Sequence, residues 1–298
     1  MCCYDGYDDQ RDHGFHGTGE WYGGRMDTST QNGLKCNGRT LWVGEPSMFA
    51  GMDPASISVV IITRNESANI DRCLQSVAWA DEIVVVDSES TDDTVERCKG
   101  HGARVVSRPF TGFGAQKNAA LDLAGCTWVF SIDADEVVSE ELARSIRHAV
   151  EHPTADAYQV RRRFFFLGKR LGHGRGSVDT IVRLVRRGTA RFSDALVHEG
   201  FEIRGVPAVL DGEMEHYSYD TINQVLEKFN RYTSLAAVEM RANNRRRSVV
   251  GTLLAWPVYF LKFYLLHGQW MNGLHGLVWS VLSSWYPFVK VAKARLDR

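Results

Sequence analysis

The sequence lacks the fingerprints of two common classes of nucleotide-binding enzyme. No glycine lies between Ile57 and the end of the helix predicted to follow it, so the G-x-G-x-x-G turn of dinucleotide-binding folds is missing. The G-x-x-x-x-G-K-[ST] phosphate loop is missing as well. These absences disfavour an NAD-type oxidoreductase and a P-loop phosphotransferase.

Cysteine spacing and charge exclude further classes. The six cysteines show no C-x-x-C spacing, which indicates reduced thiols in a cytosolic setting rather than disulfides or a structural zinc site. Lys and Arg number 35 against 36 Asp and Glu, so no overall basic excess is available to bind nucleic acid. The N-terminus has no charged segment followed by an apolar one, and we expect no secretory signal.

The first 55 residues differ in composition from the rest of the chain. In a protein of 298 residues that is 44% hydrophobic, they hold ten of the 27 glycines. Their aliphatic β-forming or leucine residues are only Leu34, Leu41 and Val43, too few to build a core. We therefore predict that residues 1–55 form a disordered leader.

From residue 56 the sequence alternates between apolar runs and amphipathic segments. The runs at 57–63, 82–87, 103–107 and 128–133 are typical of buried strands, and helical patterns follow near 66–80, 91–100, 115–124 and 139–150. Four β-α units predict an α/β fold with a doubly wound, mostly parallel sheet whose ligand lies beyond the carboxyl ends of the strands. Loops and mixed strands are expected for residues 155–217, and the domain is predicted to end at residue 220.

Residues 221–298 are predicted to form a helical extension that becomes unusually apolar from Val249. Pro257, Lys262 and Pro287 interrupt the apolar runs, which favours an in-plane membrane anchor over a spanning helix. Many Trp and Tyr residues, and arginines at 241 and 245–247, suit a membrane interface and anionic headgroups. A helical hairpin buried against the main domain or a dimer partner stays open as the alternative.

The strongest chemical signal is the motif D-A-D-E, which holds Asp133, Asp135 and Glu136 directly after an apolar run. Carboxylates at a strand end sit where an open sheet exposes its ligand, and such hard oxygen ligands suit Mg²⁺ or Mn²⁺. The alternative is that these acids only cap the helix that begins near Ser139. The motif therefore predicts a metal site bridging to substrate phosphates.

An ordered set of motifs resembles family 2 glycosyltransferases with the GT-A fold. The chain is similar in particular to the subgroup that adds β-glucose to heptose in the lipopolysaccharide core, and the resemblance covers roughly residues 57–290. The motifs are VVIITRNE, VVVDSESTDDT, QKNAAL, WVFSIDADE, FLG at 166–168, RL at 183–184, VHEGF at 197–201 and HYS at 216–218.

The resemblance implies a donor site for a nucleotide sugar and a divalent cation. Asp133 and Asp135 match the D-x-D motif, with Asp135 the direct metal ligand, and His216 could reach the metal or the diphosphate. The other implied donor-binding residues are Thr63, Asn65 and Glu66 for base and ribose, Asp87 for uracil, and Lys117 and Asn118 on a helix approaching the donor.

The resemblance also implies the acceptor chemistry. Glu199 is expected to be the general base, with Asp194 or Glu202 as the next candidates, and His198 could orient Glu199, bind acceptor phosphate or merely pack. The implied reaction is inverting transfer from UDP-glucose to a lipopolysaccharide-core glycolipid on the cytoplasmic face of the inner membrane. Transfer to polyprenyl phosphate or another envelope glycan stays open, as does an inactive nucleotide-sugar-binding membrane scaffold.

Basic and aromatic side chains alternate in the irregular region. They could form a wall for a phosphorylated glycolipid acceptor, or be ordinary solvated charges beside a hydrophobic strand. These residues are Arg161, Arg162, Arg163, Phe164, Phe165, Phe166, Lys169, Arg170 and Arg175.

Overall fold

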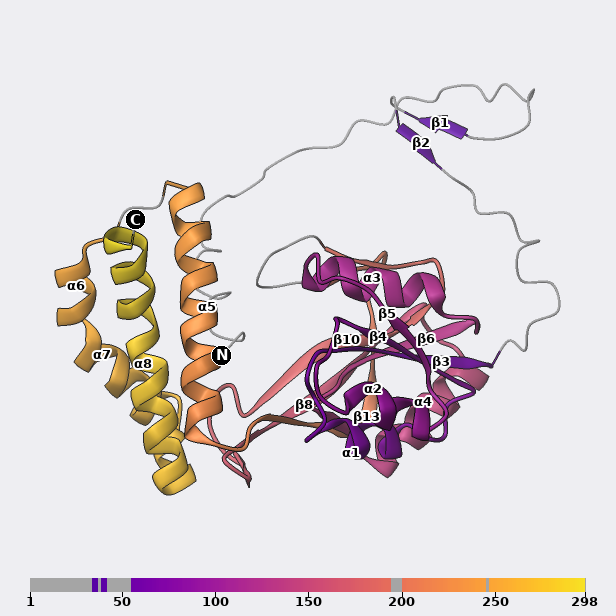
Figure 1. Cartoon of the computed structure of the whole chain (residues 1–298), viewed down its shortest axis with the longest axis horizontal. Helices are drawn as coiled ribbons and strands as arrows, with labels where there is room; N and C mark the ends of the chain where they lie inside the picture. Colours follow the sequence, from indigo (N-terminus) through magenta and orange to yellow (C-terminus); the bar gives the residue numbers. More distant parts are fainter. Residues whose placement is uncertain (1–33, 37–38, 42–54, 194–199, 245–246, 298) are drawn as a thin grey trace, which may run out of the picture. The chain divides into compact units, whose positions relative to one another are not determined.

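The computed structural model describes residues 34–36, 39–41, 55–193, 200–244 and 247–297 (Figure 1). Most of the leader predicted for residues 1–55 lies outside them. Within it, strand β1 (Leu34–Cys36) pairs antiparallel with β2 (Arg39–Leu41).

Four parallel strands form the first half of the main sheet, in the order β5-β4-β3-β6. Because the sheet is covered on both faces, successive residues of β3 enter different cores: Val59 and Ile61 pack under α1 and α4, whereas Val60 packs under α3. Figure 1 shows α3 on one face and α1, α2 and α4 on the other, which confirms the doubly wound arrangement. The elements are β3 (Ile57–Thr63), α1 (Ile70–Ser76), β4 (Glu82–Asp87), α2 (Thr94–Gly100), β5 (Arg104–Ser107), α3 (Phe113–Leu123) and β6 (Trp128–Asp133).

The second half of the sheet adds antiparallel pairings. β10 pairs antiparallel with both β6 and β8, β13 runs parallel to β8, and β7 pairs antiparallel with β13. A separate short ribbon joins β11 and β12. The elements are β7 (Glu136–Val138), α4 (Glu140–Glu151), β8 (Ala157–Phe166), β9 (Lys169–Arg170), β10 (Val178–Arg186), β11 (Arg191–Phe192), β12 (Phe201–Glu202) and β13 (Ala208–Tyr219).

Local side-chain hydrogen bonds decide where two of the helices begin. Ser139 caps α4 as predicted, because its hydroxyl accepts a hydrogen bond from the backbone N–H of Leu142 at 3.2 Å. α2 begins at Thr94, three residues later than the predicted start near Thr91. The backbone N–H of Thr91 instead donates to Asn65 Oδ1 at 2.8 Å, so this residue belongs to the loop.

The C-terminal helices begin at a capping box formed by Thr221 and Gln224, next to the predicted boundary at residue 220. Among the helices that the structure describes, none has the length and apolar character needed to cross a membrane. An aromatic cluster joins these helices to the sheet: Trp279 contacts the rings of Phe164, Phe166 and Tyr219. The elements are α5 (Ile222–Ala242), α6 (Val249–Leu254), α7 (Trp256–Leu261), a π-helical turn (Lys262–Leu266), a 3-10 turn (Gln269–Asn272) and α8 (Gly273–Leu296).

Candidate active site

The carboxyl ends of β3, β4 and β6 bring three of the predicted donor-binding residues to one edge of the sheet. The strand register places Thr63 opposite Asp87 and Ile62 opposite Asp133. Thr63 is buried, and its hydroxyl has no hydrogen-bond partner among the described residues. An unpartnered buried hydroxyl at the edge where open sheets bind ligands is a candidate contact for a ligand.

The loops that follow β3 and β4 are tied together. Asn65 adopts a left-handed conformation, with φ of 54°, and its backbone N–H donates to Ser90 Oγ at 2.9 Å. Asp87 is buried and accepts hydrogen bonds from the backbone and the hydroxyl of Ser90 at 2.9 and 2.5 Å. The loop after β3 and the loop after β4 are therefore joined into one wall beside the carboxyl ends of these strands. Asp87, the last residue of β4, is held in place where this wall meets the sheet.

Glu66 connects this wall to the D-x-D motif. Its backbone N–H donates to Thr94 Oγ1 at 2.9 Å, and its carboxylate accepts a hydrogen bond from Asn69 Nδ2 at 2.8 Å. Burial, and then the negative charge of Asp135, raise the pKa of Glu66 above its ordinary value. Glu66 and Asp135 therefore share one electrostatic environment.

Asp133 lies between two cations. Its Oδ1 lies 3.1 Å from Lys117 Nζ, and its Oδ2 accepts a hydrogen bond from Arg183 Nη2 at 2.7 Å. Burial opposes ionisation, but the positive charges of Arg183 and Lys117 outweigh it and hold the pKa of Asp133 well below its usual range. Both oxygens of Asp133 are thus engaged by protein cations.

Glu136, the last residue of D-A-D-E, is completely buried and serves the structure of the motif. Arg183 Nη2 donates to its two oxygens at 2.7 and 2.8 Å, and Arg162 Nη1 donates to Oε1 at 3.1 Å. The backbone N–H of Asp133 donates to Glu136 Oε2 at 2.9 Å. Sequence reasoning missed Arg183, although it lies in the RL motif at 183–184.

We expect Arg183→Lys to cost about 2 kcal/mol of unfolding free energy, because one ammonium cannot replace a guanidinium that joins the buried carboxylate of Glu136 to the partly buried carboxylate of Asp133. Urea unfolding followed by tryptophan fluorescence measures this cost. The matched control is Arg186→Lys, since Arg186 pairs with Asp156 at the surface and its replacement should cost below about 0.5 kcal/mol. Equal midpoints for the two variants would contradict the buried network.

Asp135 meets residues from two other elements. β7 pairs with β13 so that His216 lies opposite Glu136, and the backbone N–H of Tyr217 donates to the carbonyl of Asp135 at 2.8 Å. His216 Nε2 therefore lies 3.3 Å from Asp135 Oδ2, and Lys228 Nζ of α5 lies 3.7 Å from the same oxygen. Burial raises the pKa of Asp135, but the charges of His216 and Lys228 outweigh it and hold that pKa below its ordinary value.

The donor atoms of Asp135 and His216 fit one divalent cation. Two ligands at a right angle, each about 2.1 Å from a Mg²⁺ or Mn²⁺ ion, lie about 3 Å apart. The separation of 3.3 Å between Asp135 Oδ2 and His216 Nε2 is close to this value. Asp133 is a poorer direct ligand because Lys117 and Arg183 engage both of its oxygens, at 3.1 and 2.7 Å, whereas His216 and Lys228 lie farther from Asp135, at 3.3 and 3.7 Å from Oδ2.

Not every predicted site residue joins this group. Asn118 bonds to β11: its Nδ2 donates to the carbonyl of Phe192 at 3.0 Å, and its Oδ1 accepts the N–H of Phe192 at 2.9 Å. Its contact with the donor stays a prediction. Glu199, His198 and Asp194 lie outside the described residues. Glu202 is described, and it is the exposed residue of β12.

Several members of the predicted acceptor wall have partners within the fold. Arg162 forms a bidentate ion pair with Asp179: Nε donates to Oδ1 at 3.0 Å and Nη2 donates to Oδ2 at 2.6 Å. Arg162 also donates to Glu136. Arg163 and Arg170 both pair with Glu213. The rings of Phe164 and Phe166 are buried in the aromatic cluster under the C-terminal helices and cannot face an acceptor, whereas for the basic residues the wall stays a prediction.

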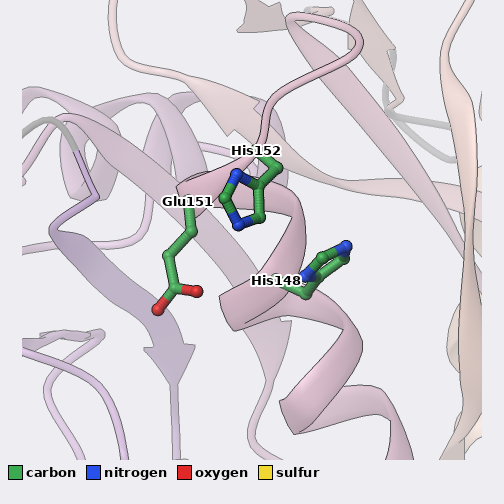
Figure 2. Close-up of side chains that lie close together, drawn as sticks. All are labelled: His148, Glu151 and His152. Carbon is green, nitrogen blue, oxygen red and sulfur yellow. The ribbon is translucent and has the colours of Figure 1, made fainter.

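A second group of metal-ligating side chains lies at the end of α4 (Figure 2). His148, Glu151 and His152 are all exposed, and their ligand atoms lie within 4.8 Å of one another. The rings of His148 and His152 meet edge to face, with centroids 5.0 Å apart. No buried residue in the described part of the chain orients them, so this group carries no functional assignment.

Comparison with known proteins adds a family match. The model of glycosyl transferase family 2 matches residues 58–199. The match begins in β3 and ends at Glu199.

Two curated relatives align over most of the chain. An uncharacterized glycosyltransferase of Rickettsia typhi is 32% identical over 254 residues, covering 80% of this chain and 86% of the relative. The lipopolysaccharide core biosynthesis glycosyltransferase LpsC of Rhizobium meliloti is 30% identical over 249 residues, covering 80% and 91%. Both alignments extend well beyond the length matched by the family model.

Among solved structures, glucosyl-3-phosphoglycerate synthase of Mycobacterium tuberculosis is 28% identical over 39% of this chain and 45% of its own. The TM-score of this match is 0.32.

Proposed function

Because the chain belongs to glycosyltransferase family 2, we propose that it transfers a sugar from a nucleoside diphosphate to a hydroxyl of an envelope glycolipid. The observation that carries the proposal is the meeting of Asp87, Asp133, Asp135 and His216 at one edge of the sheet. The similarity to LpsC supports a lipopolysaccharide-core acceptor, and UDP-glucose is the proposed donor.

The wall formed by the loops after β3 and β4 would receive the nucleoside. Asp87 would accept a hydrogen bond from the uracil ring, and the unpartnered hydroxyl of Thr63 offers a further polar contact. Asn65 and Glu66 lie on the loop that follows β3, where the ribose would lie. Lys117 and Arg183 hold the Asp133 carboxylate ionised and fixed in place.

Asp135 and His216 would hold a divalent cation at the diphosphate. The imidazole makes Mn²⁺ a better match than Mg²⁺, which takes oxygen ligands almost alone. When bound, such a cation offsets the negative charge that grows on the departing nucleoside diphosphate. Lys228 lies 3.7 Å from Asp135 Oδ2 and adds a second positive charge from outside the region matched by the family model.

Glu199 is the proposed general base. Two contacts of the described residues on either side of it support this assignment: Ser193 N–H donates to the carbonyl of Gly200 at 3.0 Å, and Lys117 Nζ, a proposed donor-site residue, lies 5.2 Å from the centroid of the Phe192 ring. The base removes the acceptor hydroxyl proton as that oxygen bonds to the anomeric carbon. The bond from this carbon to the diphosphate oxygen breaks on the opposite face, so the anomeric configuration inverts.

The proposal places the reaction at the cytoplasmic face of the inner membrane. Cys73, Cys98 and Cys126 are free thiols, in agreement with a reducing compartment.

A product assay with several donors and acceptors tests this function. Purified protein is incubated with a panel of nucleotide sugars and Mn²⁺, together with a heptose-terminated core glycolipid or a polyprenyl phosphate, and products are identified by mass. We expect a gain of one hexose on the core glycolipid. Transfer only to polyprenyl phosphate would identify the other acceptor class. Binding of a nucleotide sugar with no transfer to any acceptor would instead indicate an inactive scaffold.

A further inference from the structure

The exposed large apolar side chains of the protein are concentrated in one short stretch. Of the eighteen that the described residues present to solvent, eleven lie between residues 250 and 277. Single exposed apolar residues are common on soluble proteins, but a contiguous group marks an interaction surface.

Five of these side chains form a stripe along one side of α6, α7 and the π-helical turn. They are Val250, Leu254, Val258, Leu261 and Leu265, at helical steps of four, four, three and four residues. Ala255 is the turn residue between α6 and α7, and its φ of −77° and ψ of −9° stay in the right-handed helical region, so the stripe continues from one helix to the next. All five side chains are at least half exposed, and Leu254 reaches 73%.

The opposite side of the same helices packs on α8. Trp256 Nε1 donates to Ser284 Oγ at 2.8 Å, and the ring centroids of Trp256 and Trp285 lie 5.3 Å apart. Figure 1 shows α8 between α5 and the pair α6 and α7. Because the five side chains of the stripe are at least half exposed, they lie outside the contact with α8. Two further residues extend the apolar surface. Leu266, the last residue of the π-helical turn, is 82% exposed, and Trp270, in the 3-10 turn that follows, is 53% exposed.

The positive charge of residues 240–296 indicates which kind of partner binds the stripe. The 57 residues from 240 to 296 contain no Asp or Glu and eight Lys or Arg, which leaves 27 basic and 36 acidic residues in the rest of the chain. Two copies meeting through this surface would bring together two segments of formal charge +8. A partner with dense negative charge and an apolar interior is favoured instead.

We propose that the stripe of α6, α7 and the π-helical turn lies flat in the interfacial layer of an anionic lipid bilayer. The apolar side chains would enter the boundary between headgroups and acyl chains, and the basic residues would contact the headgroups. Trp270 is a residue type that favours this layer. The inference concerns where the protein docks and does not depend on the transfer reaction.

Vesicle co-sedimentation of the full chain tests this docking. We expect binding to vesicles of phosphatidylcholine that contain about 30% of the anionic lipid phosphatidylglycerol, and much weaker binding to vesicles of phosphatidylcholine alone. Raising the salt from about 0.1 to about 0.5 M should weaken the binding, because headgroup attraction is screened. Binding that is equal for both lipid compositions and at both salt concentrations would overturn the electrostatic part of the proposal.

Substitutions on the stripe and at the adjoining Leu266 test the apolar part of the proposal. The double variant Leu254→Asp with Leu266→Asp should bind anionic vesicles at least about tenfold more weakly, because both side chains leave water on docking. The matched control is Val206→Asp, which changes a side chain that is 90% exposed between β12 and β13 and should leave binding unchanged. Melting curves show whether each variant is folded.

A charge variant gives a second, independent readout. Arg247→Glu should weaken binding by at least about fivefold, since each basic residue near an anionic surface contributes roughly that factor.

Sedimentation velocity of the unmodified chain tests the alternative that a second copy of the protein covers the stripe. A dimer that the double variant dissociates, in a protein that binds no vesicles, would overturn the proposal and assign the stripe to a second copy.

Discussion

Asp135→Ala is expected to lower sugar transfer by roughly 10²- to 10³-fold, because the substitution removes the carboxylate that would share a divalent cation with His216. The rate is measured at saturating donor and Mn²⁺. Asp135 lies at the edge of the sheet, in the turn between β6 and β7, so its removal takes no volume from the hydrophobic core. The variant should therefore fold.

Two controls make this result specific. Asp156→Ala removes an exposed carboxylate that pairs with Arg186, away from the D-x-D motif, and should leave transfer within about twofold. Asp135→Asn keeps the shape of the side chain but weakens it as a ligand, so its activity should fall between those of the unmodified protein and Asp135→Ala. Near-normal transfer by Asp135→Ala would refute the metal assignment.

Glu199→Gln is expected to slow transfer by about 10²- to 10⁴-fold, the range that positioned general bases contribute. The amide keeps the shape of the carboxylate but cannot accept the proton of the acceptor hydroxyl. Binding of the nucleotide sugar should be retained, because the proposed donor contacts lie at the ends of β3, β4 and β6. Single-turnover transfer and equilibrium donor binding, measured on the same sample, separate the two effects.

The neighbouring acids serve as controls for Glu199. Glu202→Gln changes an exposed carboxylate on β12 and should leave transfer nearly unchanged. Unaltered transfer by Glu199→Gln, together with a large loss in Glu202→Gln or Asp194→Asn, would move the base to that residue.

The sequence was sufficient to predict the parallel half of the sheet, because local signals there agree with one another. Apolar runs bounded by polar turns predicted β3, β4 and β6 with the bounds that the structure has. The side chains at the ends of these strands could then be placed together, since parallel strands share a carboxyl edge. Thr63, Asp87 and Asp133 lie at that edge.

The partners of these residues could not be found in the same way. Arg183 reaches Glu136 across 47 positions of sequence, and Lys228 reaches Asp135 from a helix that follows the sheet. Their positions depend on the register of β10 against β6 and on the packing of α5, which no local pattern encodes. The acidic partners of Arg162 and Arg163 could not be found for the same reason, because they lie on β10 and β13, which neighbour β8 in the sheet but are far from it in the sequence.

Titration of UDP into metal-stripped protein, with and without Mn²⁺, tests the central claim most directly: that Asp135 and His216 hold a cation at a nucleotide-sugar diphosphate. We expect Mn²⁺ to strengthen UDP binding by at least about tenfold in the unmodified protein, and the gain to disappear in His216→Ala. UDP binding that is unaffected by Mn²⁺, or a gain that survives the loss of His216, would contradict the account.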